Sequence, residues 1–198
     1  IQFSGRILIS ATAFFTTLLL ARFLGVELFG EYIKVTSYIM LFMTAVDFGL
    51  NQIFLKQHKE DYLDNFGWFF SLRAVFALCL FLIAVLSLLL LQIINPYFRT
   101  QTIIGVFIAG ISVFGYSVFL SCGAIFQMQQ RFFIQALIQF CGALASLTFV
   151  VFGMYIFKSG VYIGIVAYAL SWVATALFSI LFLKFSHIRL HGNWNLQL

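Results

Sequence analysis

The stretch AVFALCLFLIAVLSLLLLQIINPYF, residues 74–98, decides the class of protein, because it contains no Asp, Glu, Lys or Arg. A helix needs about 20 apolar residues to cross a bilayer core about 30 Å thick, and this stretch is long enough. Further charge-free stretches follow it at Thr100–Gln130, Phe132–Phe157 and Ser159–Leu183. Each of them predicts another membrane-spanning helix.

Two more spans are expected before residue 74. Ile7–Ala21 is the apolar part of the first, and since it covers only about 22 Å of helix, Arg6 is expected inside the membrane. Val35–Leu55 is the second, with Asp47 as its one charge. The sequence therefore predicts an all-α, polytopic membrane helix bundle of about six transmembrane helices over residues 1–185. Residues 186–198 are expected to form a polar interfacial tail.

The composition leaves little room for other classes of protein. The chain is 63% hydrophobic and 9% charged, whereas soluble domains are about 25% charged. No nucleophile elbow, phosphate-binding loop or dinucleotide signature occurs, and His187 and His191 have no third metal ligand nearby. The net charge of +5 reflects basic residues that flank the spans. We therefore expect no enzyme, no cofactor, no metal and no nucleic-acid partner.

Polar residues recur at helical spacing in two of the spans. In the second span they follow one helical face, and in the fifth they do so again. A charge at the bilayer centre costs roughly 2.5–3.5 kcal/mol, so Asp47 is expected to face protein or a water-filled cavity. The alternatives are that Asp47 pairs with an arginine only for packing, and that the glutamines only join helices by hydrogen bonds. The two faces are Lys34, Ser37, Thr44, Asp47 and Asn51, and Arg131, Gln135, Gln139, Gly142 and Ser146.

Three stretches carry a resemblance to a known family. LARFLG at 20–25 with FGEY at 29–32 is similar to the link between the first two helices of Wzx-type polysaccharide flippases, which belong to the multidrug/oligosaccharidyl-lipid/polysaccharide exporter superfamily. DFGL at 47–50 and GAIFQMQQR at 123–131 resemble two later motifs in the same order. The resemblance spans nearly the whole chain and matches the N-terminal half of such a protein.

This resemblance implies a function and a set of partners. The chain would be one lobe of a two-lobe transporter, with the tail leading towards a second lobe, and it would flip a lipid-linked oligosaccharide carried on a polyprenyl diphosphate. Its partners would be membrane lipid, this substrate, the missing lobe and polysaccharide assembly proteins. Arginine suits a diphosphate because its fork donates paired hydrogen bonds. The candidate substrate-binding residues are Arg22, Arg6, Lys34, Asp47, Asn51, Arg73, Arg131, Gln135 and Gln139.

Two other functions stay open at this stage. A lobe of a cation-coupled multidrug exporter would use Asp47 in a lone acidic pocket, and a non-transporting membrane subunit would turn its polar faces outward. Arg22 also has a simpler interpretation as an interfacial anchor. The excess of basic residues on one side predicts that both termini lie in the cytoplasm. The residues on that side are Arg6, Lys56, Lys59, Arg73, Arg131, Lys184 and Arg189. The resemblance implies that the membrane is the inner membrane of a bacterium.

Overall fold

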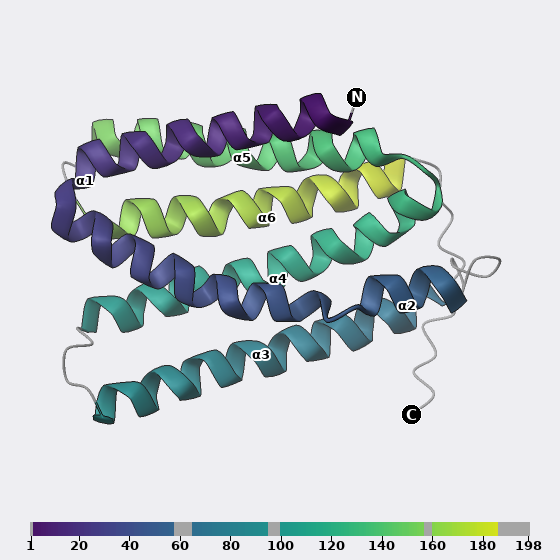
Figure 1. Cartoon of the computed structure of the whole chain (residues 1–198), viewed down its shortest axis with the longest axis horizontal. Helices are drawn as coiled ribbons and strands as arrows, with labels where there is room; N and C mark the ends of the chain where they lie inside the picture. Colours follow the sequence, from purple (N-terminus) through teal and green to yellow (C-terminus); the bar gives the residue numbers. More distant parts are fainter. Residues whose placement is uncertain (1, 58–64, 95–99, 157–159, 186–198) are drawn as a thin grey trace.

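The protein is a bundle of helices throughout the part that the structure describes (Figure 1). This computed structural model describes residues 2–57, 65–94, 100–156 and 160–185. The expected tail 186–198, with His187, Arg189 and His191, lies outside these ranges, as does Lys59. The helices are α1 (Gln2–Asp47), α2 (Leu50–Gln57), α3 (Phe66–Ile94), α4 (Thr100–Met128), α5 (Phe132–Ile156) and α6 (Val161–Phe185).

α1 consists of two halves joined by a sharp bend. The helix has 46 residues and would be about 69 Å long if it were straight. At Gly25 the backbone adopts φ 70° and ψ 177°, a conformation that only glycine tolerates well. The chain then turns back, so that the first half (2–24) and the second half (26–47) run in opposite directions (Figure 1).

The spans agree with the expected membrane topology. Five helical stretches among the described residues are long and apolar enough to cross a membrane, and the first of them, Arg6–Lys56, contains both halves of α1. With the halves counted separately, the bundle matches the expected number of about six. α3 begins at Phe66 rather than at residue 74, so Arg73 lies inside the helix instead of at its edge.

The second span differs from the sequence-based expectation. Helix was expected without interruption over Val35–Leu55, but α1 ends at Asp47 and α2 begins at Leu50. Phe48 and Gly49 between them have φ values of 30° and 78°. Asp47 and Asn51 are four residues apart, which also suits an uninterrupted helix, so their spacing did not reveal the break.

α4 is the centre of the bundle. It packs against α1, α3 and α6, while α6 also packs against α5, and α5 against α1 (Figure 1). In the apolar stretch of α4, 56% of the residues are buried, compared with 17% in the apolar stretch of α3. The outer side of α3 is exposed and apolar, with Val75, Leu82 and Leu86 on its surface, as expected for a helix that faces lipid.

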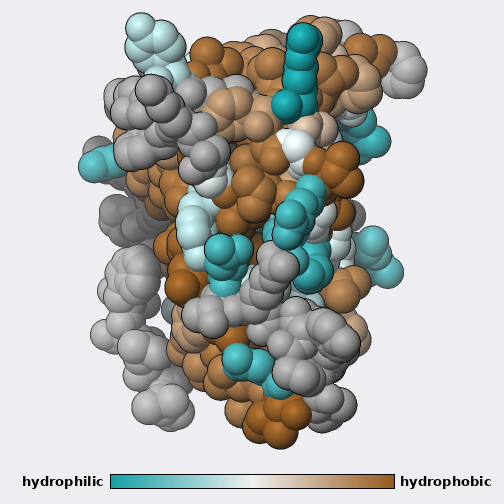
Figure 2. Space-filling view, turned by 90° about the vertical axis from the view of Figure 1, so that its left-hand side faces the viewer, coloured by the Kyte–Doolittle hydropathy of each residue, from teal (hydrophilic) through white to brown (hydrophobic). Residues whose placement is uncertain are grey.

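The end of the bundle at the α1 bend is more polar than its sides. Figure 2 looks onto this end, where hydrophilic side chains lie among the hydrophobic side chains that make up most of the surface. The charged residues Arg22, Glu27, Glu31 and Lys34 lie close to the bend in the sequence. This arrangement places the bend at a membrane surface.

Two glycines let α6 approach its neighbours closely. A Cβ on Gly115 of α4 would lie 2.6 Å from the backbone oxygen of Trp172. A Cβ on Gly142 of α5 would collide with Thr175 Oγ1 and lie 2.9 Å from the Ser171 carbonyl oxygen. Small residues at such crossings are typical of membrane helix packing, where backbones gain contact by close approach. The two glycines therefore fix the position of α6 between α4 and α5.

Candidate functional site

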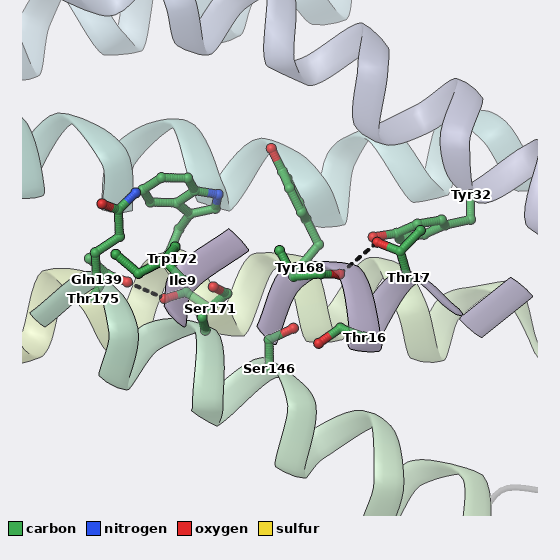
Figure 3. Close-up of a pocket in the computed structure, with 12 residues that line it drawn as sticks. Ile9, Thr16, Thr17, Tyr32, Gln139, Ser146, Tyr168, Ser171, Trp172 and Thr175 are labelled. Atoms are coloured by element: carbon green, nitrogen blue, oxygen red, sulfur yellow. Dashed lines mark hydrogen bonds between the residues drawn. The ribbon is translucent and has the colours of Figure 1, made fainter. Parts of the chain in front are cut away.

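A groove lined by both polar and apolar side chains lies between the first half of α1, α5 and α6. It consists of two hollows of about 300 and 380 Å³, which share Ile9 and Gln139 and so form one groove. The first hollow is drawn in Figure 3. Its polar lining consists of Thr16, Thr17, Tyr32, Gln139, Ser146, Tyr168, Ser171, Trp172 and Thr175.

Hydroxyl and amide groups give this groove its chemistry. Thr16 Oγ1 donates to the Thr12 carbonyl oxygen at 2.8 Å, and Thr175 Oγ1 donates to the Ser171 carbonyl oxygen at 2.7 Å. A hydroxyl that donates in this way still has lone pairs with which to accept. The Gln139 amide has no hydrogen bond to any residue that the structure describes. The groove therefore offers uncharged donors and acceptors, the groups that pair with the hydroxyls of a sugar.

Aromatic rings form the wall of the first hollow towards the second half of α1 (Figure 3). Trp172 meets Tyr116 edge to face, with ring centroids 4.9 Å apart. The Tyr168 hydroxyl donates to Met43 Sδ at 3.1 Å, and Tyr32 packs onto Gly164. These contacts hold the rings in place, so the groove has a preformed aromatic surface.

Arg6 lies where the groove meets the outer surface of the bundle. It lines the second hollow with Gln127 and Gln135, whose side chains are joined by a hydrogen bond of 3.4 Å. It also lines a shallow hollow on the outside of α1, next to Phe14 and Phe15, which are exposed. Within the described ranges, Arg6 forms no ion pair. Its charge therefore lies between a polar interior and an apolar exterior.

Arg73 belongs to a separate cluster at the break between α1 and α2. Although fully buried, its guanidinium contacts Asn51 Oδ1 at 2.8 Å, Asp47 Oδ1 at 3.3 Å and Ser121 Oγ at 3.5 Å. The guanidinium also lies over the Phe69 ring, 4.6 Å from its centroid. Asp47 therefore pairs with the Arg73 guanidinium and does not form a lone acidic pocket.

The remaining candidate residues lie apart from the groove. Lys34 Nζ binds Glu31 Oε1 at 2.7 Å and faces an apolar crevice that Tyr38 and Leu88 also line. Arg22 is exposed near the α1 bend, and Arg131 lies in the turn before α5, where its backbone nitrogen donates to the Phe126 carbonyl oxygen.

Arg6, Arg22, Lys34 and Arg73 are all candidate substrate-binding residues, and the structure does not bring them together in one cavity. The expected inner polar face of the second span holds only at its end, where Asp47 contacts Arg73 and Asn51 is buried. Lys34, Ser37 and Thr44 are exposed, and Asn51 lies beyond the break in the helix. Gln135 and Gln139, by contrast, line the groove together with Arg6.

Several groove residues were missed from the sequence. Tyr168, Ser171, Trp172 and Thr175 lie at positions i, i+3, i+4 and i+7 of α6, which is a signal of one helical face. In a helix this apolar, aromatic and small residues also fit plain packing, so the spacing could not distinguish a wall of a groove from a core. The positions of Thr16 and Thr17 in the sequence also did not distinguish the wall of a groove from a packed core.

The fold is that of a polytopic membrane protein with a partly polar groove between its helices. The chain belongs to the polysaccharide biosynthesis protein family, whose sequence profile matches residues 2–196. This match confirms the resemblance to Wzx-type flippases, and members of the family are flippase transporters rather than enzymes. No curated protein and no solved structure matches the chain.

Proposed function

We propose that this chain forms one lobe of a transporter that flips a polyprenyl-diphosphate-linked oligosaccharide across the cytoplasmic membrane of a bacterium, for polysaccharide biosynthesis. Residues 1–185 make the lobe, and residues 186–198 lead towards a second lobe. Both termini face the cytoplasm. The substrate, membrane lipid, the second lobe and polysaccharide assembly proteins are the partners.

The position of Arg6 carries this proposal. An amphiphilic substrate has a sugar part, a charged diphosphate and an apolar tail in this order, and three matching surfaces meet here. The groove offers hydroxyls, amides and aromatic rings to the sugars. The Arg6 guanidinium can donate paired hydrogen bonds to the diphosphate. The apolar outer surface of α1 adjoins the lipid and can contact the apolar tail.

Arg22 lies apart from the groove but offers a second arginine to the diphosphate. It lies on the same half of α1 as Arg6, about 24 Å further along the helix and towards the other membrane surface. A diphosphate that enters beside Arg6 on the cytoplasmic side would meet Arg22 when it arrives at the outer side. Gln135 and Gln139 contact the sugars between these points, while Lys34 and Arg131 attract the substrate from the ends of the bundle.

A cation-coupled exporter is the second candidate, and the Asp47 contact argues against it. A coupling ion would have to compete with the Arg73 guanidinium, which is buried and cannot leave at low cost. A non-transporting subunit is also disfavoured, because the polar residues of α5 line an internal groove that such a subunit does not need.

Glycan export in cells tests the proposal. The variants are Arg6→Gln and Arg6→Lys in the protein as it occurs in the cell, with Lys56→Gln as a matched control, since Lys56 is an exposed cation of α2 outside the groove. We expect Arg6→Gln to lose most export, Arg6→Lys to recover part of it, and the control to export normally, all at normal membrane abundance. Full export by Arg6→Gln would refute a diphosphate contact at this position.

A further inference from the structure

The joint between α1 and α2 is a strained point in the second half of the expected span. Phe48 has a φ of 30°, which is rare for a bulky residue, and Gly49 follows with a φ of 78°. A Cβ on Gly49 would meet no atom within 4 Å, so no close packing forces this conformation on the chain. Two helices that meet at such a joint can change their relative angle through a few backbone dihedrals.

The α2 side of this joint is held firmly. Asn51 accepts a hydrogen bond of 2.8 Å from the Arg73 guanidinium of α3. One turn further along α2, Phe54 stacks on Phe69 of α3, with ring centroids 4.2 Å apart, and both rings are buried. α2 is therefore attached to α3 through one charged hydrogen bond and one aromatic stack.

The last turn of α1 is packed through Val46, which is fully buried, but the Asp47 carboxylate beside it has few contacts. Among the described residues, the Asp47 carboxylate contacts Arg73 Nη2 alone, at 3.3 Å, which is longer than the 2.7–2.9 Å usual for a charged pair. The Asp47 side chain is 39% exposed, whereas the Arg73 side chain is fully buried. Arg73 Nε is also buried, and no acceptor among the described residues is within hydrogen-bonding distance of it. A buried donor without a partner is unfavourable, and an arginine fork can bind a carboxylate through two nitrogens.

The second half of α1 also reaches the groove. It carries Tyr32, which lines the groove, and Met43, whose sulfur accepts the hydrogen bond of Tyr168 from the opposite wall. A change in the angle of this half-helix at Phe48 and Gly49 would therefore move one wall of the groove relative to α6.

We propose that Arg73 is a positioning residue and that its pair with Asp47 is a latch for this joint. Arg73 keeps α2 on α3, while Asp47 swings between the present single contact and a closed arrangement that also satisfies Nε. The second half of α1 turns with Asp47 and changes the shape of the groove. The link to transport rests on the proposed function, whereas the latch itself does not.

The latch can be measured without any transport assay. Spin labels at the exposed positions Thr44 of α1 and Val75 of α3 report the distance between the two helices in the purified protein. Asp47→Asn removes the charge but keeps an acceptor, so we expect the distance distribution to widen or shift. Gly49→Ala restricts the joint and should narrow or shift it, whereas Gly67→Ala is the matched control, since its Cβ also meets no atom within 4 Å and its backbone is helical. Distributions for Asp47→Asn and Gly49→Ala that equal the wild type would overturn the latch.

The role in transport needs a second readout. In cells, we expect Asp47→Asn and Gly49→Ala to lower the rate of glycan export at saturating substrate at least fivefold, with the substrate concentration for half-maximal export changed less than twofold. A change confined to that concentration would make these residues substrate contacts and overturn the positioning role. If the distances respond but the chain moves no lipid-linked glycan, the latch stands and the proposed function fails.

Discussion

Replacing Gly25 by alanine tests whether the reversal of α1 depends on a backbone conformation that only glycine tolerates well. At φ 70° and ψ 177°, a residue with a side chain costs about 1–3 kcal/mol of strain. A Cβ at this position would meet no atom within 4 Å, so no steric clash adds to that cost. Gly30 is the matched control, because it lies in the same helix with equally open surroundings and no positive φ.

The comparison of the two variants isolates the strain. Both replacements restrict the unfolded chain by the same amount, so this effect cancels in the difference between them. We therefore expect Gly25→Ala to be less stable than Gly30→Ala by about 1–3 kcal/mol. The free energy of unfolding would be measured by SDS titration of the purified protein in mixed micelles. Equal stabilities of the two variants would show that the bend does not need this backbone conformation, and the reasoning would be wrong.

Three further predictions concern packing, charge and a buried hydroxyl. Gly142→Ala should lose about 1–3 kcal/mol of stability in the same titration, because the new Cβ would collide with Thr175 and force α5 away from α6. An unchanged stability would contradict the close approach of these helices. Arg22→Lys should lose most glycan export while its membrane abundance stays normal, because a lysine cannot bind a diphosphate with a fork; wild-type export would leave Arg22 as an interfacial anchor. Tyr168→Phe should cost about 0.5–1.5 kcal/mol of stability, because it removes the hydrogen bond to the Met43 sulfur. The control Tyr155→Phe, at a residue that is 90% exposed, should cost nothing measurable. Equal losses of stability in the two variants would refute the role of the Tyr168 hydroxyl.

The sequence by itself determined the class of protein and the position of most spans. The charge-free stretches Thr100–Gln130 and Phe132–Phe157 correspond closely to α4 and α5, which run over Thr100–Met128 and Phe132–Ile156. The spans can be predicted in this way because the bilayer core excludes each charged residue individually, whichever residues surround it in the fold. The family was also accessible, since its motifs are short and lie in the chain in a fixed order.

The tertiary structure alone decided which polar groups meet. Arg73 contacts Asp47 and Asn51 across separate helices, whereas the sequence left open whether Asp47 faces a cavity or pairs with an arginine and named no particular arginine. Gln139 shares a groove with Tyr168 and Trp172, which the sequence did not single out. The physical reason is that most residues of these helices are apolar, so periodicity alone does not fix how each helix rotates about its axis. That rotation is set by close contacts such as those of Gly115 and Gly142, and only the packed bundle contains them.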